Sequence, residues 1–77
     1  MSEFKTRFYE DWTGVEFTLR WRNQDDYLAA RRFLEGLLGG PASTIAGHDY
    51  FVLDNEQQFD ALFAFRRELG YGVGIGE

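Results

Sequence analysis

The single histidine is the first residue in this sequence that could do chemistry. His48 is followed directly by Asp49, and an imidazole beside a carboxylate can act as a general base or contribute to a metal site. Neighbouring residues on a strand point to opposite faces, however, so these two side chains cannot easily act together. A metal site would need further ligands, and neither Asp54 nor Glu56 stands at a recognised ligand spacing. We therefore expect a structural or solvent-facing histidine and no metal.

The other reactive groups form no catalytic motif. The carboxylate pairs Glu10-Asp11 and Asp25-Asp26 suit general acid-base chemistry, but a turn and a helix start account for them. No Ser, Thr or Lys occupies a nucleophile motif, and the chain has no cysteine. The glycine-rich segment 70–76 follows a predicted helix, whereas a dinucleotide-binding loop opens one. The sequence therefore predicts a protein that is not an enzyme and binds no cofactor.

Aromatic residues and acidic charge are the most informative parts of the composition. The 77 residues include eight Phe, four Tyr and two Trp, and thirteen Asp and Glu outnumber eight Lys and Arg, giving a net charge of -5. A domain of this size has few interior positions, so we expect some rings on the surface, where they commonly mark contact sites. The negative balance favours a basic protein partner, and no direct binding of nucleic acid is expected.

The length of the chain limits the number of domains, and its lack of cysteine indicates the compartment. A chain this short is expected to form a single domain over 1–77. The absence of cysteine favours a reducing compartment, and the N-terminal sequence lacks the pattern of a signal peptide. No apolar run approaches the roughly 20 residues of a membrane span. We therefore expect a cytoplasmic protein that makes no membrane contact.

Two alternating segments at the start of the chain predict a β-hairpin. Residues 3–9 and 15–22 alternate apolar and polar side chains, and turn residues occupy 11–14. This loop length pairs rings across the two strands: Phe8 with Phe17, and Phe4 with Trp21. The outer face of the hairpin would hold half of the cations: Lys5, Arg7, Arg20 and Arg22. With Tyr9 nearby, such a face could hold single-stranded nucleic acid, but a solvated strand face explains it too.

The rest of the chain predicts two helices and one or two further strands. Helical periodicity and capping residues place amphipathic helices over 24–38 and 55–69, with Arg66 reaching over the edge of the core. The apolar run within 45–53 predicts an interior strand covered on both faces, parallel to the second hairpin strand. A short edge strand fits 71–76. The predicted fold is α+β: a two-layer ββαβα(β) domain with two helices on one face of a small mixed sheet.

Trp12 is the residue that we single out for partner binding. It stands at the hairpin tip beside Glu10 and Asp11, which suits a pocket rimmed by Lys or Arg, unless the ring folds back under the sheet. The other candidate contact residues are acidic and lie around the two helix starts: Asp25, Asp26, Asp54, Glu56 and Asp60. They would form one negative patch if both helices begin at the same end of the sheet.

These features favour a non-catalytic protein-interaction module that engages a basic partner through acidic residues and surface rings. In size, acidity and absence of catalytic motifs, the chain resembles small acidic proteins of bacteriophages, such as anti-CRISPR and anti-restriction inhibitors. The resemblance implies an inhibitor that occupies a basic, nucleic-acid-binding surface of its partner. The alternative is a self-associating structural or regulatory subunit, in which the surplus rings and the glycine-rich edge are buried in a homodimer.

Overall fold

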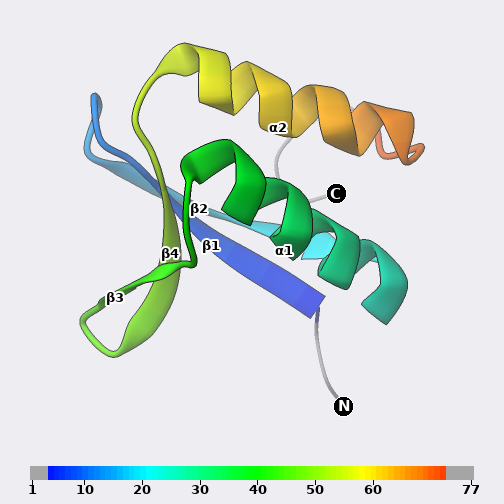
Figure 1. Ribbon diagram of the computed structural model, residues 1–77, viewed down its shortest axis with the longest axis horizontal. Helices are drawn as coiled ribbons and strands as arrows, with labels where there is room; N and C mark the ends of the chain where they lie inside the picture. Colours follow the sequence, from blue (N-terminus) through cyan, green and yellow to red (C-terminus); the bar gives the residue numbers. More distant parts are fainter. Residues whose placement is uncertain (1–3, 73–77) are drawn as a thin grey trace.

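A computed structural model describes residues 4–72, which form one mixed four-stranded sheet and two helices (Figure 1). In chain order the elements are β1 (Phe4–Glu10), β2 (Val15–Trp21), α1 (Gln24–Leu38), β3 (Ser43–Ile45), β4 (His48–Leu53) and α2 (Glu56–Glu68). Both helices lie on one face of the sheet, with the core between the two layers. The protein therefore has the predicted α+β architecture, with one strand more between the helices than expected.

The N-terminal hairpin has the predicted register. β1 and β2 are antiparallel, with Phe8 opposite Phe17 and Phe4 opposite Trp21. The rings of Phe8 and Phe17 stack with 5.0 Å between their centroids. The turn ends at Gly14, whose φ of 75° is a left-handed conformation that glycine adopts without a steric penalty.

Both helices begin at the predicted capping residues. Asn23 accepts a hydrogen bond from the backbone N–H of Asp26 at 2.8 Å, and Asn55 accepts one from the N–H of Gln58 at 3.0 Å. Each bond satisfies one of the amides that a helix start leaves unpaired. α1 ends at Gly39, which has a left-handed φ of 81°. α1 matches its predicted range, and α2 is one residue shorter at each end.

The single strand predicted over 45–53 is wrong, because the segment contains a turn. β3 and β4 form a second hairpin around Ala46 and Gly47, which have φ values of 51° and 83°. This turn reverses the chain, so β4 runs parallel to β1, with Phe51 opposite Phe8, and not parallel to β2 as predicted. The sheet order is β2-β1-β4-β3, which places β4 in the interior as expected.

β4 is covered on one face only, contrary to the prediction. Phe51 and Leu53 are buried under the helices, whereas Tyr50 and Val52 are half-buried on the opposite face. Neither helix packs on that opposite face (Figure 1). We call it the open face of the sheet.

The core takes up most of the rings. Its buried apolar members are Phe8, Leu19, Trp21, Ala30, Leu34, Phe51, Leu53, Leu62 and Tyr71. Trp12 is the one exposed ring of the fourteen, at 39%, and most of the others are half-buried at the margin of the core. Three rings do not pack against the core: Tyr9, Trp12 and Tyr50. Tyr71 and Gly72 belong to no strand, and the remainder of the predicted strand over 71–76 lies outside the described residues.

Candidate protein-interaction site

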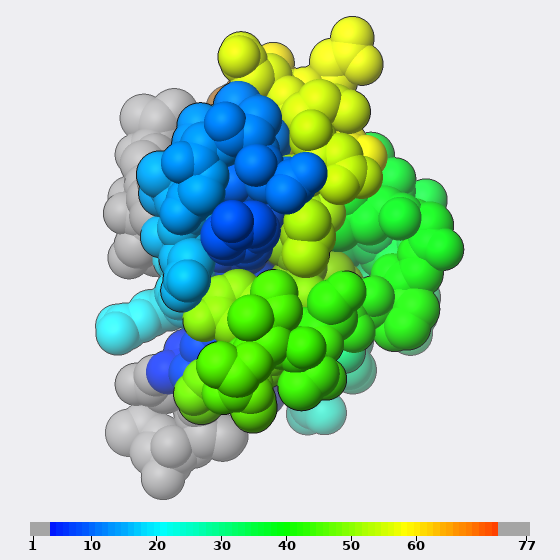
Figure 2. Space-filling model, turned by 90° about the vertical axis from the view of Figure 1, so that its left-hand side faces the viewer, coloured from blue at the N-terminus to red at the C-terminus, as the bar shows by residue number. Residues whose placement is uncertain are grey.

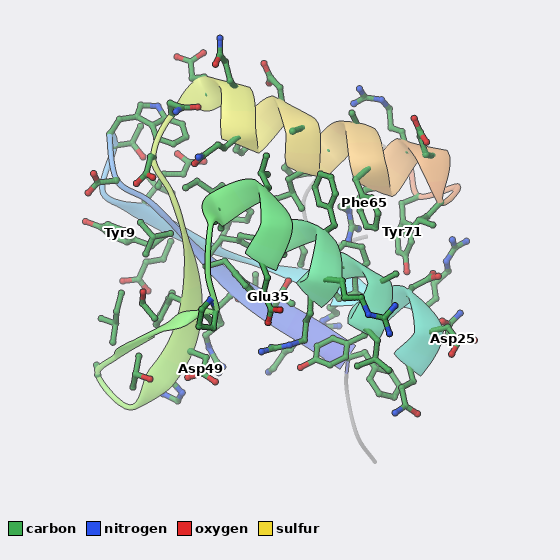
Figure 3. The ribbon with its side chains drawn as sticks, in the orientation of Figure 1. Tyr9, Asp25, Glu35, Asp49, Phe65 and Tyr71 are labelled. Atoms are coloured by element: carbon green, nitrogen blue, oxygen red, sulfur yellow. The ribbon has the colours of Figure 1, made fainter. Side chains whose placement is uncertain are left out.

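The structure divides the predicted contact residues between two ends of the molecule. α1 follows the end of β2, which pairs with the beginning of β1, so Asp25 and Asp26 lie at that end. α2 follows the end of β4, which pairs with the end of β1, so α2 begins beside the first hairpin turn. Figure 3 shows Asp25 and Tyr71 at the right of the molecule, and Tyr9 at the left. The two helix starts therefore do not form one negative patch.

Six of the predicted residues remain together, and we call them the acidic end: Glu10, Asp11, Trp12, Asp54, Glu56 and Asp60. The backbone N–H of Asp11 donates to the carbonyl oxygen of Leu53 at 2.9 Å, directly before Asp54. Figure 2 shows the blue hairpin turn against the yellow segment that leads into α2. The parallel pairing of β1 with β4 thus joins two acidic segments that are distant in the sequence.

No basic residue close in sequence offsets the charge of the acidic end. Residues 8–19 and 33–65 contain neither Lys nor Arg. Four of the carboxylates are exposed, and Glu10 is half-buried, with its Oε1 accepting a hydrogen bond from the Thr13 hydroxyl at 2.7 Å. Within residues 4–72, no carboxylate of the acidic end forms an ion pair. Four carboxylates at this end of the molecule are therefore accessible to solvent.

Trp12 stays outside the core and does not fold back under the sheet. Its exposure is 39%, and Val15, at the start of β2, is 51% exposed. Val15 shares a strand face with Phe17, whose ring packs against Phe59 at 5.9 Å and Phe63 at 6.4 Å on α2. The acidic end thus combines a large accessible ring with a partly exposed apolar margin, the composition that protein interfaces favour.

At the opposite end, Asp26 already has partners within the molecule. Its Oδ2 accepts a hydrogen bond from the Tyr71 phenol at 2.8 Å and lies 3.6 Å from Nη2 of Arg22. The phenol oxygen of Tyr71 in turn accepts from the backbone N–H of Arg22 at 2.7 Å. Asp25 is exposed beside this network. We therefore interpret Asp26 as a structural residue, and leave both aspartates out of the acidic end.

Next to this network lies a buried arginine that the sequence did not predict. Arg66 is fully buried and does not reach over the edge of the core. Its guanidinium carbon lies 4.6 Å from the ring centroid of Trp21 and 4.3 Å from that of Tyr71, and Nη1 donates to the carbonyl oxygen of Arg20 at 3.0 Å. The two ring faces and the carbonyl stabilise a charge that is otherwise costly to bury. The sequence signal was an arginine within a phenylalanine-rich helix face.

His48 and Asp49 lie on opposite faces of β4, as strand geometry predicts. Asp49 accepts a hydrogen bond from the Thr44 hydroxyl at 3.3 Å, and His48 is exposed on the open face. Across residues 4–72, no group of three His, Cys, Asp or Glu is placed to hold a metal ion. Over the same residues, neither helix has the length and apolar character needed to cross a membrane.

The acidic end offers four exposed carboxylates and one exposed ring. Such a surface can attract and hold a cationic macromolecule. Comparison with known proteins adds no further constraint on the partner. No protein-family model, no curated protein sequence and no solved structure matches this chain.

Proposed function

We propose that this protein is a non-catalytic interaction module whose acidic end docks on a basic surface of a protein partner. The observation that supports this most directly is the hydrogen bond between Asp11 and Leu53, which joins the hairpin turn to the start of α2. It brings the two segments that carry five carboxylates and Trp12 to the same end of the molecule. The Lys and Arg residues that bind phosphates in a nucleic-acid-binding groove would suit this surface. Inhibition of a nucleic-acid-binding protein in the cytoplasm is the specific form that we propose.

Electrostatic attraction supplies the first step of the proposed docking. The acidic end is free of Lys and Arg from its own segments, so its field is not cancelled locally. Long-range attraction of this kind raises association rates, and it weakens as salt shortens the screening length to about 8 Å at physiological ionic strength. We therefore expect association with the partner to slow markedly with added salt.

Trp12 supplies the second step, because burial of its exposed part slows release. A buried aromatic side chain removes about 150 to 250 Å² from water, so the 39% of Trp12 that is exposed corresponds to roughly 60 to 100 Å². At about 25 cal/mol per Å², this area contributes about 1.5 to 2.5 kcal/mol. A Trp12→Ala variant should therefore bind the partner about 10-fold to 70-fold more weakly.

Affinity capture with charge-reversal variants tests the proposal. The variant Asp11→Lys/Asp54→Lys/Glu56→Lys reverses the acidic end, and Asp25→Lys/Glu35→Lys/Glu68→Lys reverses three exposed carboxylates elsewhere. Both variants change the net charge by the same amount. The protein captured by the wild type at low salt should be lost with the first variant and retained with the second.

A competition measurement then tests the inhibitory form of the proposal. Added wild-type protein should displace double-stranded nucleic acid from the captured partner, and the reversed acidic end should not. Equal capture by all three proteins would contradict the proposal. A dimer that persists in high salt, together with an absence of captured protein, would instead support the self-associating subunit.

A further inference from the structure

The open face of the sheet gathers cations and rings from three strands. The register places Arg7 of β1 opposite Thr18 of β2 and Tyr50 of β4. Lys5, Arg20 and His48 are exposed on this face, and Arg7, Tyr9 and Tyr50 are half-buried. Arg22, which was predicted to belong to it, turns away, and its guanidinium carbon lies 4.1 Å from the ring centroid of Tyr71.

Tyr50 lies across the surface of the sheet. Its phenol donates a hydrogen bond to Oε1 of Glu16 at 3.0 Å, and Glu16 belongs to β2, on the far side of β1 from Tyr50. Neighbouring strands are about 4.8 Å apart, so the two side chains together span roughly 10 Å and pass over β1. The bond holds the Tyr50 ring down on the sheet, with one side of the ring turned outward.

Tyr9 also extends along the surface of the sheet, towards the hairpin turn. Its phenol oxygen lies 4.0 Å from the position that a Cβ atom on Gly14 would occupy. Tyr9 and Tyr50 are diagonal neighbours, because Arg7 is paired with Tyr50 and Tyr9 with Val52. The open face therefore holds two neighbouring rings beside three basic side chains.

The negative net charge of the chain does not cancel this positive face. Lys5 and Arg20 are opposite each other in the register of β1 and β2, at the end of the hairpin away from the acidic end. Glu10 lies five positions after Lys5 along β1, about 17 Å at 3.3 to 3.4 Å per residue, which is twice the screening length of about 8 Å at physiological salt. Among residues 4–72, neither Arg7 nor Arg20 forms an ion pair, and the nearby carboxylate of Glu16 accepts the Tyr50 hydrogen bond.

We infer that the open face binds single-stranded nucleic acid, with phosphates on Lys5, Arg7 and Arg20 and bases stacked on Tyr9 and Tyr50. Every base has a face that can stack on a ring, so binding by this surface would tolerate many sequences. An acidic protein would satisfy the cations but would make no use of the two rings beside them. The expectation of no nucleic acid rests on net charge alone, whereas the pairing of β4 with β1 places Tyr50 beside Arg7.

This inference is independent of the proposed function, because it uses another surface. Fluorescence anisotropy with a labelled 12-nucleotide oligothymidine strand tests it at 50 and 200 mM salt. Single strands lose affinity with a slope of about -0.7 per phosphate contact, so three contacts predict about 15-fold to 20-fold weaker binding at the higher salt. The reversed acidic end, Asp11→Lys/Asp54→Lys/Glu56→Lys, should bind the strand at least as tightly as the wild type.

Matched variants locate the binding surface. Arg7→Glu/Arg20→Glu should weaken binding at least tenfold, whereas Arg32→Glu/Arg67→Glu, with the same charge change on the two helices, should retain it. Loss of a stacked ring costs about fivefold or more, so Tyr50→Ala should bind weakly. Tyr50→Phe keeps the ring but removes its hydrogen bond to Glu16, so its affinity should lie between those of Tyr50→Ala and the wild type. Thermal melts followed by circular dichroism establish that each variant is folded.

Three results would overturn the inference. The first is an absence of binding to the oligothymidine strand by the wild type at 50 mM salt. The second is an equal loss of binding in the two double-arginine variants. The third is competition by polyglutamate that equals competition by unlabelled strand, because an acidic protein would then be the better description of the ligand.

Discussion

The two helix starts have the same local sequence chemistry and different surroundings. Each has an Asn cap followed by acidic residues, and each lies near a tryptophan of the first hairpin. At α1, Asp26 accepts a hydrogen bond from Tyr71 and faces Arg22. At α2, the carboxylates are exposed and none forms an ion pair within residues 4–72. Acidic first turns alone therefore do not identify a binding site.

The two helix starts differ because different side chains lie beside them. The end of α2 brings Arg66 and Tyr71 back to the start of α1, where they pack with Trp21. The start of α2 is next to the hairpin turn, whose segment contains no Lys or Arg. One end of the molecule is thus closed by its own residues, whereas the other leaves four carboxylates and Trp12 exposed.

The two ends should differ most in how far the free energy of unfolding falls when an aromatic ring is removed. Tyr71 is 7% exposed, lies between two guanidinium groups and forms two hydrogen bonds through its phenol. Tyr71→Ala should therefore lower the free energy of unfolding by about 3 kcal/mol or more, as for other buried rings. Trp12→Ala should lower it by less, because the Trp12 ring is partly exposed and does not pack against the core. Urea denaturation measures both, and similar losses would contradict the contrast.

A smaller difference in unfolding free energy is expected when a carboxylate is removed from each end. Asp26→Ala removes the acceptor of the Tyr71 hydrogen bond, which should cost about 1 to 2 kcal/mol of unfolding free energy. The ion pair with Arg22 adds little, because the Arg22 side chain is 54% exposed. Asp60→Ala at the acidic end should change stability by less than about 0.5 kcal/mol. A costly Asp60→Ala would show that the acidic end has a structural role as well.

The turn at Ala46 and Gly47 determines at which end of the sheet α2 begins. The strained backbone of Ala46 in this turn can be relieved by substitution. Ala46 has a left-handed φ of 51°, which costs a residue with a Cβ atom about 1 to 2 kcal/mol. Asparagine tolerates this conformation, so Ala46→Asn should stabilise the protein by about 0.5 to 1 kcal/mol in urea denaturation. Gly47→Ala, at a φ of 83°, should destabilise it and serves as the opposite control. A destabilising Ala46→Asn would contradict the assigned turn.

The smallest expected effect concerns the open face. The hydrogen bond to Glu16 raises the pKa of the Tyr50 phenol above its ordinary value, and the nearby Arg7 guanidinium opposes this. The bond therefore stabilises the fold below the ordinary pKa of about 10, and the contribution is lost as the pH rises through the higher pKa of the folded state. In an NMR titration, Glu16→Ala should lower the pKa of Tyr50. An unchanged pKa would show that the bond does not form in solution.

Local signals in the sequence were enough to predict the first hairpin and both helices. Alternation over 15–22 fixed the faces of β2, and the caps at Asn23 and Asn55 marked the helix starts. The second hairpin was missed because β3 has only three residues and its turn lacks an Asn-Gly signal, having Ala46 in a strained conformation.

The missed turn also explains why the predicted contact residues are divided between two ends of the molecule. Without the reversal at Ala46, β4 would run parallel to β2, and α2 would begin beside Asp25 and Asp26. With the reversal, α2 begins beside Asp11 and Trp12. The burial of Arg66 could not be predicted either, because it depends on rings that come together only in the folded chain.

Amide-resolved NMR of the whole protein, titrated with an octa-arginine peptide at low and high salt, tests whether the acidic end is the docking surface. We expect salt-sensitive shifts at 10–13 and 54–60, with quenching of Trp12 fluorescence, and little change at Asp25 and Asp26. Shifts centred on the start of α1, or spread evenly over all carboxylates, would contradict the assignment of the acidic end as the docking surface.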